Sequence, residues 1–291
     1  MGINGWRRLI ISSKAQLSVH GNAVTIHQDD SDVLISLAQL HTIMIENPAV
    51  MLSTAFLTRM AEENIAVIVC DSKYMPAVEL VSLHNETTNR LETQRNWENT
   101  RKDHVWMQIL HRKLQSEIDL LEKYHLQNRD QLLSLQSSIH SIEQCDVIES
   151  QAAKYYFHAL YGPDFFRRTE SITNSALNYG YSIILSSISR AIVVHGLHPA
   201  IGIHHSNKKN PFNLSCDLIE PFRSIVDEYV YQYPDRELDW SYKKEMIGIT
   251  QKLITYTQKR MTVEQAIDCM VLDVISAMNN AEQQIGVLGY A

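Results

Sequence analysis

The sequence lacks several features that would have placed it in common protein classes. No apolar run reaches the roughly 20 residues that span a bilayer, and the polar start does not resemble a signal peptide. The four cysteines are far apart, which argues against a zinc ribbon and suits a reducing cytosol. HExxH, paired CxxC and Walker-type glycine motifs are also missing. We therefore expect a cytoplasmic protein with no membrane partner.

Positive charge is scarce as well. The 26 Lys and Arg residues against 33 Asp and Glu give a formal net charge of −7. Because binding to nucleic acid neutralises phosphates, a DNA-binding function would need a local basic patch or a basic partner. The length of 291 residues and the hydrophobic content of 45% indicate a globular protein with a large core, divided into two domains.

The hydrophobic pattern changes from a period of two to a helical period near His84. Residues 1–83 are predicted to form strands around one helix, and residues 84–105 a polar linker that passes into a long exposed helix. Residues 106–291 are predicted to be helical. The sequence thus predicts an α+β fold with a small, β-sandwich-like N-terminal domain and a larger all-α domain.

Four predicted helices of the second domain matter here. The segment CDVIESQAAKYYFHALYG predicts a helix that Asp146 opens, with Glu149 at capping-box spacing. Ser171 to His195 is apolar nearly all round and is predicted to be the buried central helix, in which Asn178 is a polar exception that could orient ligands. Two closing helices are predicted at Tyr242 to Tyr256 and Thr262 to Asn280.

One stretch, from His195 to Asp227, concentrates the residue types that bind divalent metals. It contains four histidines and three carboxylates beside two lysines and an arginine. Asp217 and Glu220 are three residues apart, so they share a face of a helix that Pro221 places near its first turn, at the positive end of the helix dipole. Spacing alone leaves two interpretations open: a metal site, or a solvated loop before a helix that Asp217 caps.

Three motifs stand along the chain in this order: CDVIESQAAKYYF, AIGIHH and NLSCDLIEPFR. The opening MGINGWRRLIISSKAQL resembles the branch of adaptation proteins found with single-protein, dual-RNA-guided effector nucleases, and the three motifs carry a resemblance to the CRISPR-associated adaptation integrase family. It implies a metal-dependent DNA endonuclease and integrase that inserts prespacer DNA into a CRISPR array by 3′-hydroxyl attack on repeat phosphodiesters. It aligns Glu149, His205 and Glu220 with the three metal ligands of the family, which implies Mg²⁺ or Mn²⁺. The family often carries aspartate where this chain has Glu220.

The resemblance also suggests roles for neighbouring residues. Asp217 is expected to be an auxiliary ligand or to hold a water, His204 to be structural or a proton relay, and Asn178 to support the ligands. Contacts to DNA phosphates are expected from cationic side chains, and Trp97 could stack on a base. Solvated faces and local ion pairs remain the alternative for each cation. The expected cationic contacts are Arg90, Arg167, Lys208, Lys209 and Arg223.

Partners follow from the same resemblance. It implies prespacer and repeat DNA, a homodimer formed mostly through the first domain, and a small ferredoxin-like protein that bridges two dimers into a heterohexamer. Further adaptation proteins and the effector nuclease are additional candidates. Two other functions fit the residues: a metal-dependent hydrolase of a small molecule or nucleotide, and a non-catalytic helical scaffold. A deep apolar pocket beside the ligands would favour the hydrolase.

Overall fold

The computed structural model describes the chain except residues 1–6, 29–30, 64, 73–75, 81–86 and 291. The chain divides into two compact units, Met1–Thr88 and Asn89–Ala291. The domain boundary predicted at residue 83 lies outside the described residues. Among the described residues, no helix combines the length and the apolar character needed to cross a membrane.

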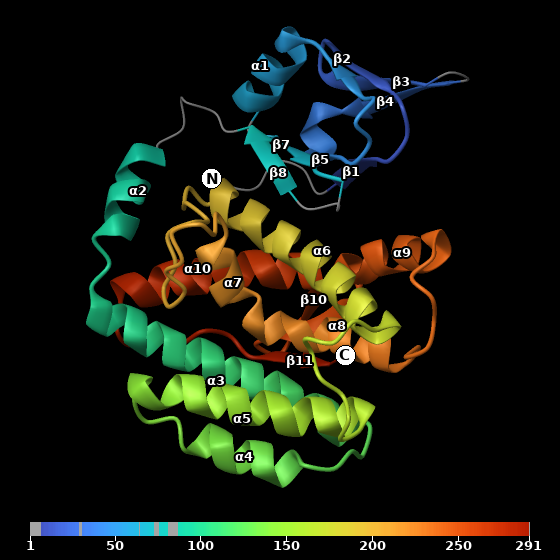
Figure 1. Ribbon diagram of the computed structural model, residues 1–291. Helices are drawn as coiled ribbons and strands as arrows, with labels where there is room; N and C mark the ends of the chain where they lie inside the picture. Colours follow the sequence, from blue (N-terminus) through green and yellow to red (C-terminus); the bar gives the residue numbers. More distant parts are fainter. Residues whose placement is uncertain (1–6, 29–30, 64, 73–75, 81–86, 291) are drawn as a thin grey trace. The chain divides into compact units, whose positions relative to one another are not determined.

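In the part of the smaller unit that the structure describes, two four-stranded sheets lie with the α-helix α1 (Figure 1). One sheet has the order β1-β5-β7-β8 and the other β4-β3-β2-β6. The β2–β3 hairpin turns at Gly21, whose positive φ of 57° a glycine adopts without strain. The elements are β1 (Arg7–Ile11), β2 (Gln16–His20), β3 (Ala23–Gln28), β4 (Ser31–Ser36), β5 (Leu40–Ile45), β6 (Met51–Leu52), α1 (Thr54–Glu62), β7 (Ala66–Cys70) and β8 (Pro76–Leu80).

Helix α1 covers the core of this unit, as its sequence pattern predicts. The Ser53 hydroxyl accepts a hydrogen bond from the backbone N–H of Phe56 and caps the helix. Phe56 and Met60, one turn apart, are both fully buried. Buried residues of β2, β3, β5 and β7 pack in the same core, among them Leu17, Val24, Ile43 and Val67.

The larger unit is a helical assembly around α6, which packs against α7, α8, α9 and α10 (Figure 1). The Ser171 side chain caps α6 at its start, and Gly196, with φ of 77°, follows its end. The helices are α2 (Thr87–Arg95), α3 (Asn99–Lys123), α4 (Arg129–Ser137), α5 (Ile142–Tyr161), α6 (Ile172–Val194), α7 (Asn213–Leu218), α8 (Arg223–Tyr231), α9 (Trp240–Ile247) and α10 (Val263–Asn279). The predicted α+β class and the buried central helix are confirmed.

The larger unit also contains a small sheet that the all-α prediction missed. Strands β9 (Leu253–Tyr256), β10 (Lys259–Thr262) and β11 (Leu288–Tyr290) form it in the order β10-β9-β11. The predicted helix from Tyr242 to Tyr256 is therefore wrong in its second half. The β9–β10 hairpin turns through Thr257 and Gln258, which both have positive φ. That turn normally uses Asn or Gly, so the sequence carried no hairpin signal.

The long exposed helix predicted from the linker is two helices. Helix α2 ends at Arg95 and α3 begins at Asn99, with Trp97 in the break. The Trp97 side chain is only 8% exposed and belongs to the core of the larger unit. The expectation that Trp97 offers a stacking surface for a base is therefore wrong.

Two predicted helix starts are also wrong. Helix α5 begins at Ile142 after Ser141, so Asp146 and Glu149 lie within the helix and Glu149 is not part of a capping box. Asp217 lies near the end of α7, not at the start of a helix. Glu220 begins a separate 3₁₀ turn, Glu220–Phe222, that precedes α8. The two carboxylates therefore do not share one positive helix end.

Candidate active site

The histidine loop is organised by Asp217, which is completely buried. Its Oδ2 accepts hydrogen bonds from the backbone N–H groups of Ile203 (2.6 Å) and His204 (3.2 Å). Its Oδ1 accepts from the backbone N–H of His205 at 3.0 Å and lies 2.7 Å from Nδ1 of the same residue. Both carboxylate oxygens are thus occupied in holding the loop and in orienting one imidazole.

Two buried amides fix the rest of the loop. Gln94 of α2 donates to the carbonyl oxygens of His198 and Ile201 and accepts from the His198 backbone N–H. Asn213 donates to the carbonyl oxygens of Ala200 and Asn207. The chain passes so close to Asp217 at Gly202 that a Cβ there would lie 2.9 Å from Oδ2. The loop is therefore a pre-formed structure, although it has no regular secondary structure.

The Trp106 ring of α3 contacts the imidazole rings of both His204 and His205. Its ring stacks on His204 with centroids 4.3 Å apart and meets His205 edge-on at 5.9 Å. The His204 ring is also fixed through its Nε2, which lies 3.1 Å from Oδ1 of Asp146. These contacts hold the His204 ring in place, and its role as a structural residue or a proton relay stays a prediction. The hydrogen bond to Asp217 raises the pKa of His205.

Glu149 and Glu220 converge on one point from separate elements. Glu149 projects from α5 and Glu220 from the 3₁₀ turn, and Lys113 of α3 lies between them. The Lys113 Nζ is 2.5 Å from Glu149 Oε1 and 2.6 Å from Glu220 Oε2. Oε2 of Glu220 makes no well-directed hydrogen bond within the described residues, so its contact with Lys113 is an ion pair without hydrogen-bond geometry.

Burial and charge set the protonation of this cluster. Burial alone would lower the pKa of Lys113, but Glu220 and Glu149 raise it overall. Burial would raise the pKa of Glu220, yet Arg223 and Lys113 together lower it to about 2. By contrast, burial raises the pKa of Glu117, one turn from Lys113 on α3, to about 8. Lys113 and Glu220 are therefore an ionised pair at neutral pH.

Arg223 and Arg167 contact other protein groups around this cluster. Arg223 donates from Nε to Glu220 Oε1 at 2.9 Å and lies over the Tyr181 ring. Arg167 donates to Asn174 and to Asn178, and it also lies over Tyr181. Asn178 is thus joined to Arg167, and through Tyr181 to the region of Arg223. Through these contacts Arg223 is held in place, and Arg223 in turn positions Glu220.

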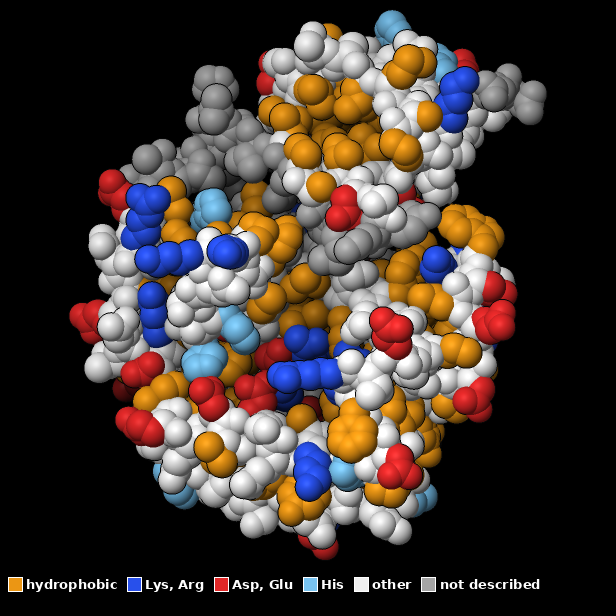
Figure 2. All heavy atoms as spheres, in the orientation of Figure 1, with side chains coloured by type: hydrophobic (Ala, Val, Ile, Leu, Met, Phe, Trp, Pro, Cys, Tyr) orange, Lys and Arg blue, Asp and Glu red, His pale blue; other side chains and the backbone are white. Residues whose placement is uncertain are grey.

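The remaining predicted DNA contacts lie on the surface or outside the described side chains. Lys208 and Lys209 are exposed in the histidine loop. Arg90 lies in α2, but its side chain is not among those described. Figure 2 shows His, acidic and basic side chains beside one another in the middle of the face of the larger unit.

The side chains of Glu149, His205 and Glu220 are of the kinds that bind a divalent cation, although they are not arranged around a common metal position. Among the described residues, no three His, Cys, Asp or Glu side chains are placed to hold a metal ion. The Lys113 ammonium occupies the point on which Glu149 and Glu220 converge. Since Nδ1 of His205 bonds to Asp217, Nε2 is the nitrogen that can coordinate a metal. Two carboxylates and one imidazole suit Mn²⁺ or Mg²⁺.

Four residues of this site were not predicted from the sequence: Lys113, Glu117, Trp106 and Gln94. For Lys113 and Glu117 a signal was present. Both lie at helical spacing within the apolar stripe of α3 that includes Ile109 and Leu110, and charged residues on a buried face require partners. Gln94 gave no such signal, because it belongs to a uniformly polar segment.

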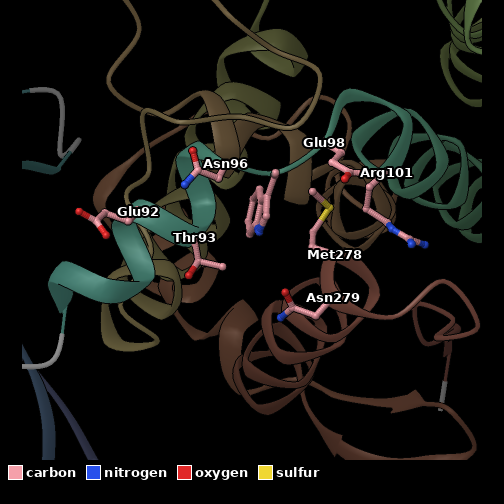
Figure 3. Close-up of a pocket in the computed structure, with 8 residues that line it drawn as sticks. Glu92, Thr93, Asn96, Glu98, Arg101, Met278 and Asn279 are labelled. Atoms are coloured by element: carbon pink, nitrogen blue, oxygen red, sulfur yellow. The ribbon is translucent and has the colours of Figure 1, made fainter.

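A pocket elsewhere in the larger unit is lined mostly by polar side chains of α2, α3 and α10. Figure 3 shows Glu92 and Arg101 at opposite ends of it. Glu149, His205 and Glu220 do not line this pocket. It is therefore not the apolar chamber beside the ligands that a small-molecule hydrolase would need.

Comparison with known proteins gives a consistent result. The model of the family described as CRISPR associated protein Cas1 matches residues 9–244. The chain is 29% identical over 285 residues to the CRISPR-associated endonuclease Cas1 of Neisseria meningitidis serogroup C (strain 8013), an alignment that covers 91% of this chain and 90% of that protein.

Solved structures agree with the fold. A chain of a Cas6-RT-Cas1–Cas2 complex is similar with a TM-score of 0.71 and 18% identity, covering 98% of this chain and 36% of that one. A casposase bound to integration product is similar with a TM-score of 0.60 and 16% identity, covering 96% of this chain and 97% of that one. At these identities the likeness concerns the fold.

Proposed function

The chain belongs to the Cas1 family of CRISPR-associated proteins, and we propose that it is a metal-dependent DNA endonuclease and integrase that inserts prespacer DNA into a CRISPR array. One observation carries the proposal: the Glu149 and Glu220 carboxylates converge on one cationic group, the Lys113 ammonium, beside the histidine loop. The relatives support it, since one is named an endonuclease and another is bound to an integration product.

Each residue of the site has a distinct task in the proposed reaction. Glu149, His205 and Glu220 would hold Mn²⁺ or Mg²⁺; when bound, such an ion supplies Lewis acidity at the phosphoryl oxygen and favours ionisation of the attacking 3′-hydroxyl. Asp217 fixes the tautomer of His205 by accepting the Nδ1 proton, so its auxiliary role is to orient a ligand. Arg223 holds one oxygen of Glu220 in place.

The proposal is tested by strand transfer in a reconstituted reaction. The purified chain, its small ferredoxin-like partner and Mn²⁺ are mixed with a 3′-hydroxyl prespacer and a plasmid that carries the repeat. We expect relaxed and half-site products on a gel, and none when a chelator is present, because each transesterification needs the metal. Products that form equally well in the chelator would contradict the metal-dependent mechanism.

DNA binding itself is expected to depend on phosphate contacts. Arg90→Ala and Lys208→Ala should each weaken binding to unrelated duplexes to the same extent and reduce the salt slope by about one. Fluorescence anisotropy over a range of salt concentrations measures this, with Lys259→Ala, an exposed lysine of β10, as the control. A change in sequence preference would mean that the residue contacts bases. Lys209 is proposed as a further contact, whereas the internal contacts of Arg167 and Arg223 favour positioning roles.

The partners proposed are a second copy of the chain and a small ferredoxin-like protein that completes a heterohexamer on DNA. Strand β4 lies at a sheet edge, with Val33 and Leu34 43% and 67% exposed, and an apolar edge of this kind favours pairing with another chain. A structural neighbour belongs to a Cas6-RT-Cas1–Cas2 complex, which supports the presence of a partner protein. Such an assembly would supply the positive surface that this acidic chain lacks.

A further inference from the structure

Lys113 stands out because a buried ammonium lies where the proposed function requires a metal ion. Its side chain is 8% exposed and contacts both proposed carboxylate ligands, Glu149 and Glu220. An ammonium and a divalent cation cannot share this position, since like charges at such short range repel strongly. The side chain of Lys113 must therefore move when a metal binds.

A second acceptor for the ammonium lies one helical turn away. Glu117 is four residues after Lys113 on α3, so both side chains lie on the same helix face. Glu117 is 4% exposed, and its Oε2 has no hydrogen-bond partner among the described residues. The lysine ammonium has three donors on a flexible four-carbon chain, which lets it change partners without movement of the backbone.

We propose that Lys113 is a positioning residue that holds Glu149 and Glu220 together when no divalent cation is bound, and that it transfers its ammonium to Glu117 when one binds. This inference rests on the proposed metal-dependent function. In the metal-free protein, Lys113 offsets the repulsion between two carboxylates and keeps them pre-organised. After the transfer, two ligand carboxylates face the divalent cation. Glu117, which burial keeps protonated at neutral pH, releases its proton to solvent as the ammonium approaches, so that a carboxylate and an ammonium face each other.

Two substitutions are expected to change metal affinity in opposite directions. Lys113→Met removes the competing cation, so Mn²⁺ should bind about tenfold more tightly or better, while the metal-free protein melts at a lower temperature. Glu117→Gln removes the second carboxylate and leaves the ammonium between the ligands, so Mn²⁺ should bind more weakly. A purely structural role for Lys113 would not produce opposite shifts.

Titration calorimetry with Mn²⁺ on the full chain, together with thermal unfolding without metal, measures these effects. Lys123→Met is the matched control: it removes a lysine from the same helix that pairs with another buried carboxylate, Glu228, and Mn²⁺ affinity should not change. If Mn²⁺ affinity is unchanged in both Lys113→Met and Glu117→Gln, this inference is overturned and the proposed function still stands. If Lys113→Met does not fold, an affinity in Glu117→Gln equal to or higher than that of the wild type overturns it. Absence of Mn²⁺ binding in the wild type would overturn the proposed function as well.

Discussion

His205→Ala is expected to abolish strand transfer, by at least about a thousandfold, while the chain stays folded and binds DNA as before. The imidazole is the one nitrogen ligand of the proposed metal site, and its side chain is 43% exposed on a loop that backbone contacts to Asp217 hold in place. Its removal therefore takes a ligand from the site and little packing from the core.

The measurement is the reconstituted strand-transfer reaction, with circular dichroism and anisotropy to confirm fold and DNA affinity. His198→Ala is the control, because it changes another exposed histidine of the same loop, whose position the backbone contacts to Gln94 secure. Full strand transfer by His205→Ala would end the integrase assignment. Equal loss in His198→Ala would show that the loop as a whole had been disturbed.

The two proposed carboxylate ligands, Glu149 and Glu220, are better tested with glutamine than with alanine. Alanine is unsuitable at Glu220, which is 4% exposed. It would remove one of the two carboxylates that contact the buried Lys113 ammonium, and the carboxylate that pairs with the half-buried Arg223. Glu220→Gln and Glu149→Gln preserve the volume and remove the charge, so they should lower strand transfer with a smaller loss of stability.

The parts of the fold that the sequence predicted well are those with local signals. Helix α6 is apolar along its length and has a serine cap, and α1 has a serine cap and a regular apolar face. The hairpin of β9 and β10 was missed because Thr257 and Gln258 have the backbone conformation of a type I′ turn without its usual residues. The start of α5 was misplaced because Asp146 and Glu149 imitate a capping box inside a longer helix.

In the site, too, some features could be predicted from the sequence and others could not. The three proposed ligands came from the family resemblance, and the spacing indicated only that the region suits a metal. The arrangement of Asp217 could not be predicted, because its hydrogen bonds join residues twelve to fourteen positions apart through a loop without periodicity. Lys113 could not be placed either, since its two partners lie on α5 and on the 3₁₀ turn, and only the tertiary fold brings these together.

Trp106→Ala is expected to have the second large effect, on stability and metal binding together. The indole is 1% exposed, so its loss should cost about 3–5 kcal/mol of unfolding free energy. The same ring stacks on His204 and supports His205, so the histidines would lose the surface that orients them. Mn²⁺ affinity should fall with stability, and Trp106→Phe should restore most of both because it keeps an aromatic face.

Trp97→Ala provides the comparison that separates these two roles. Trp97 is also a nearly buried tryptophan of the same core, at 8% exposure, but it lines the pocket of Figure 3 and not the histidine loop. Chemical unfolding followed by helical circular dichroism should show a large loss for both variants. Calorimetry with Mn²⁺ should show weaker binding for Trp106→Ala only. If the two variants bind Mn²⁺ equally well, Trp106 stabilises the core without positioning His205, and the orientation of that ligand depends on Asp217 alone.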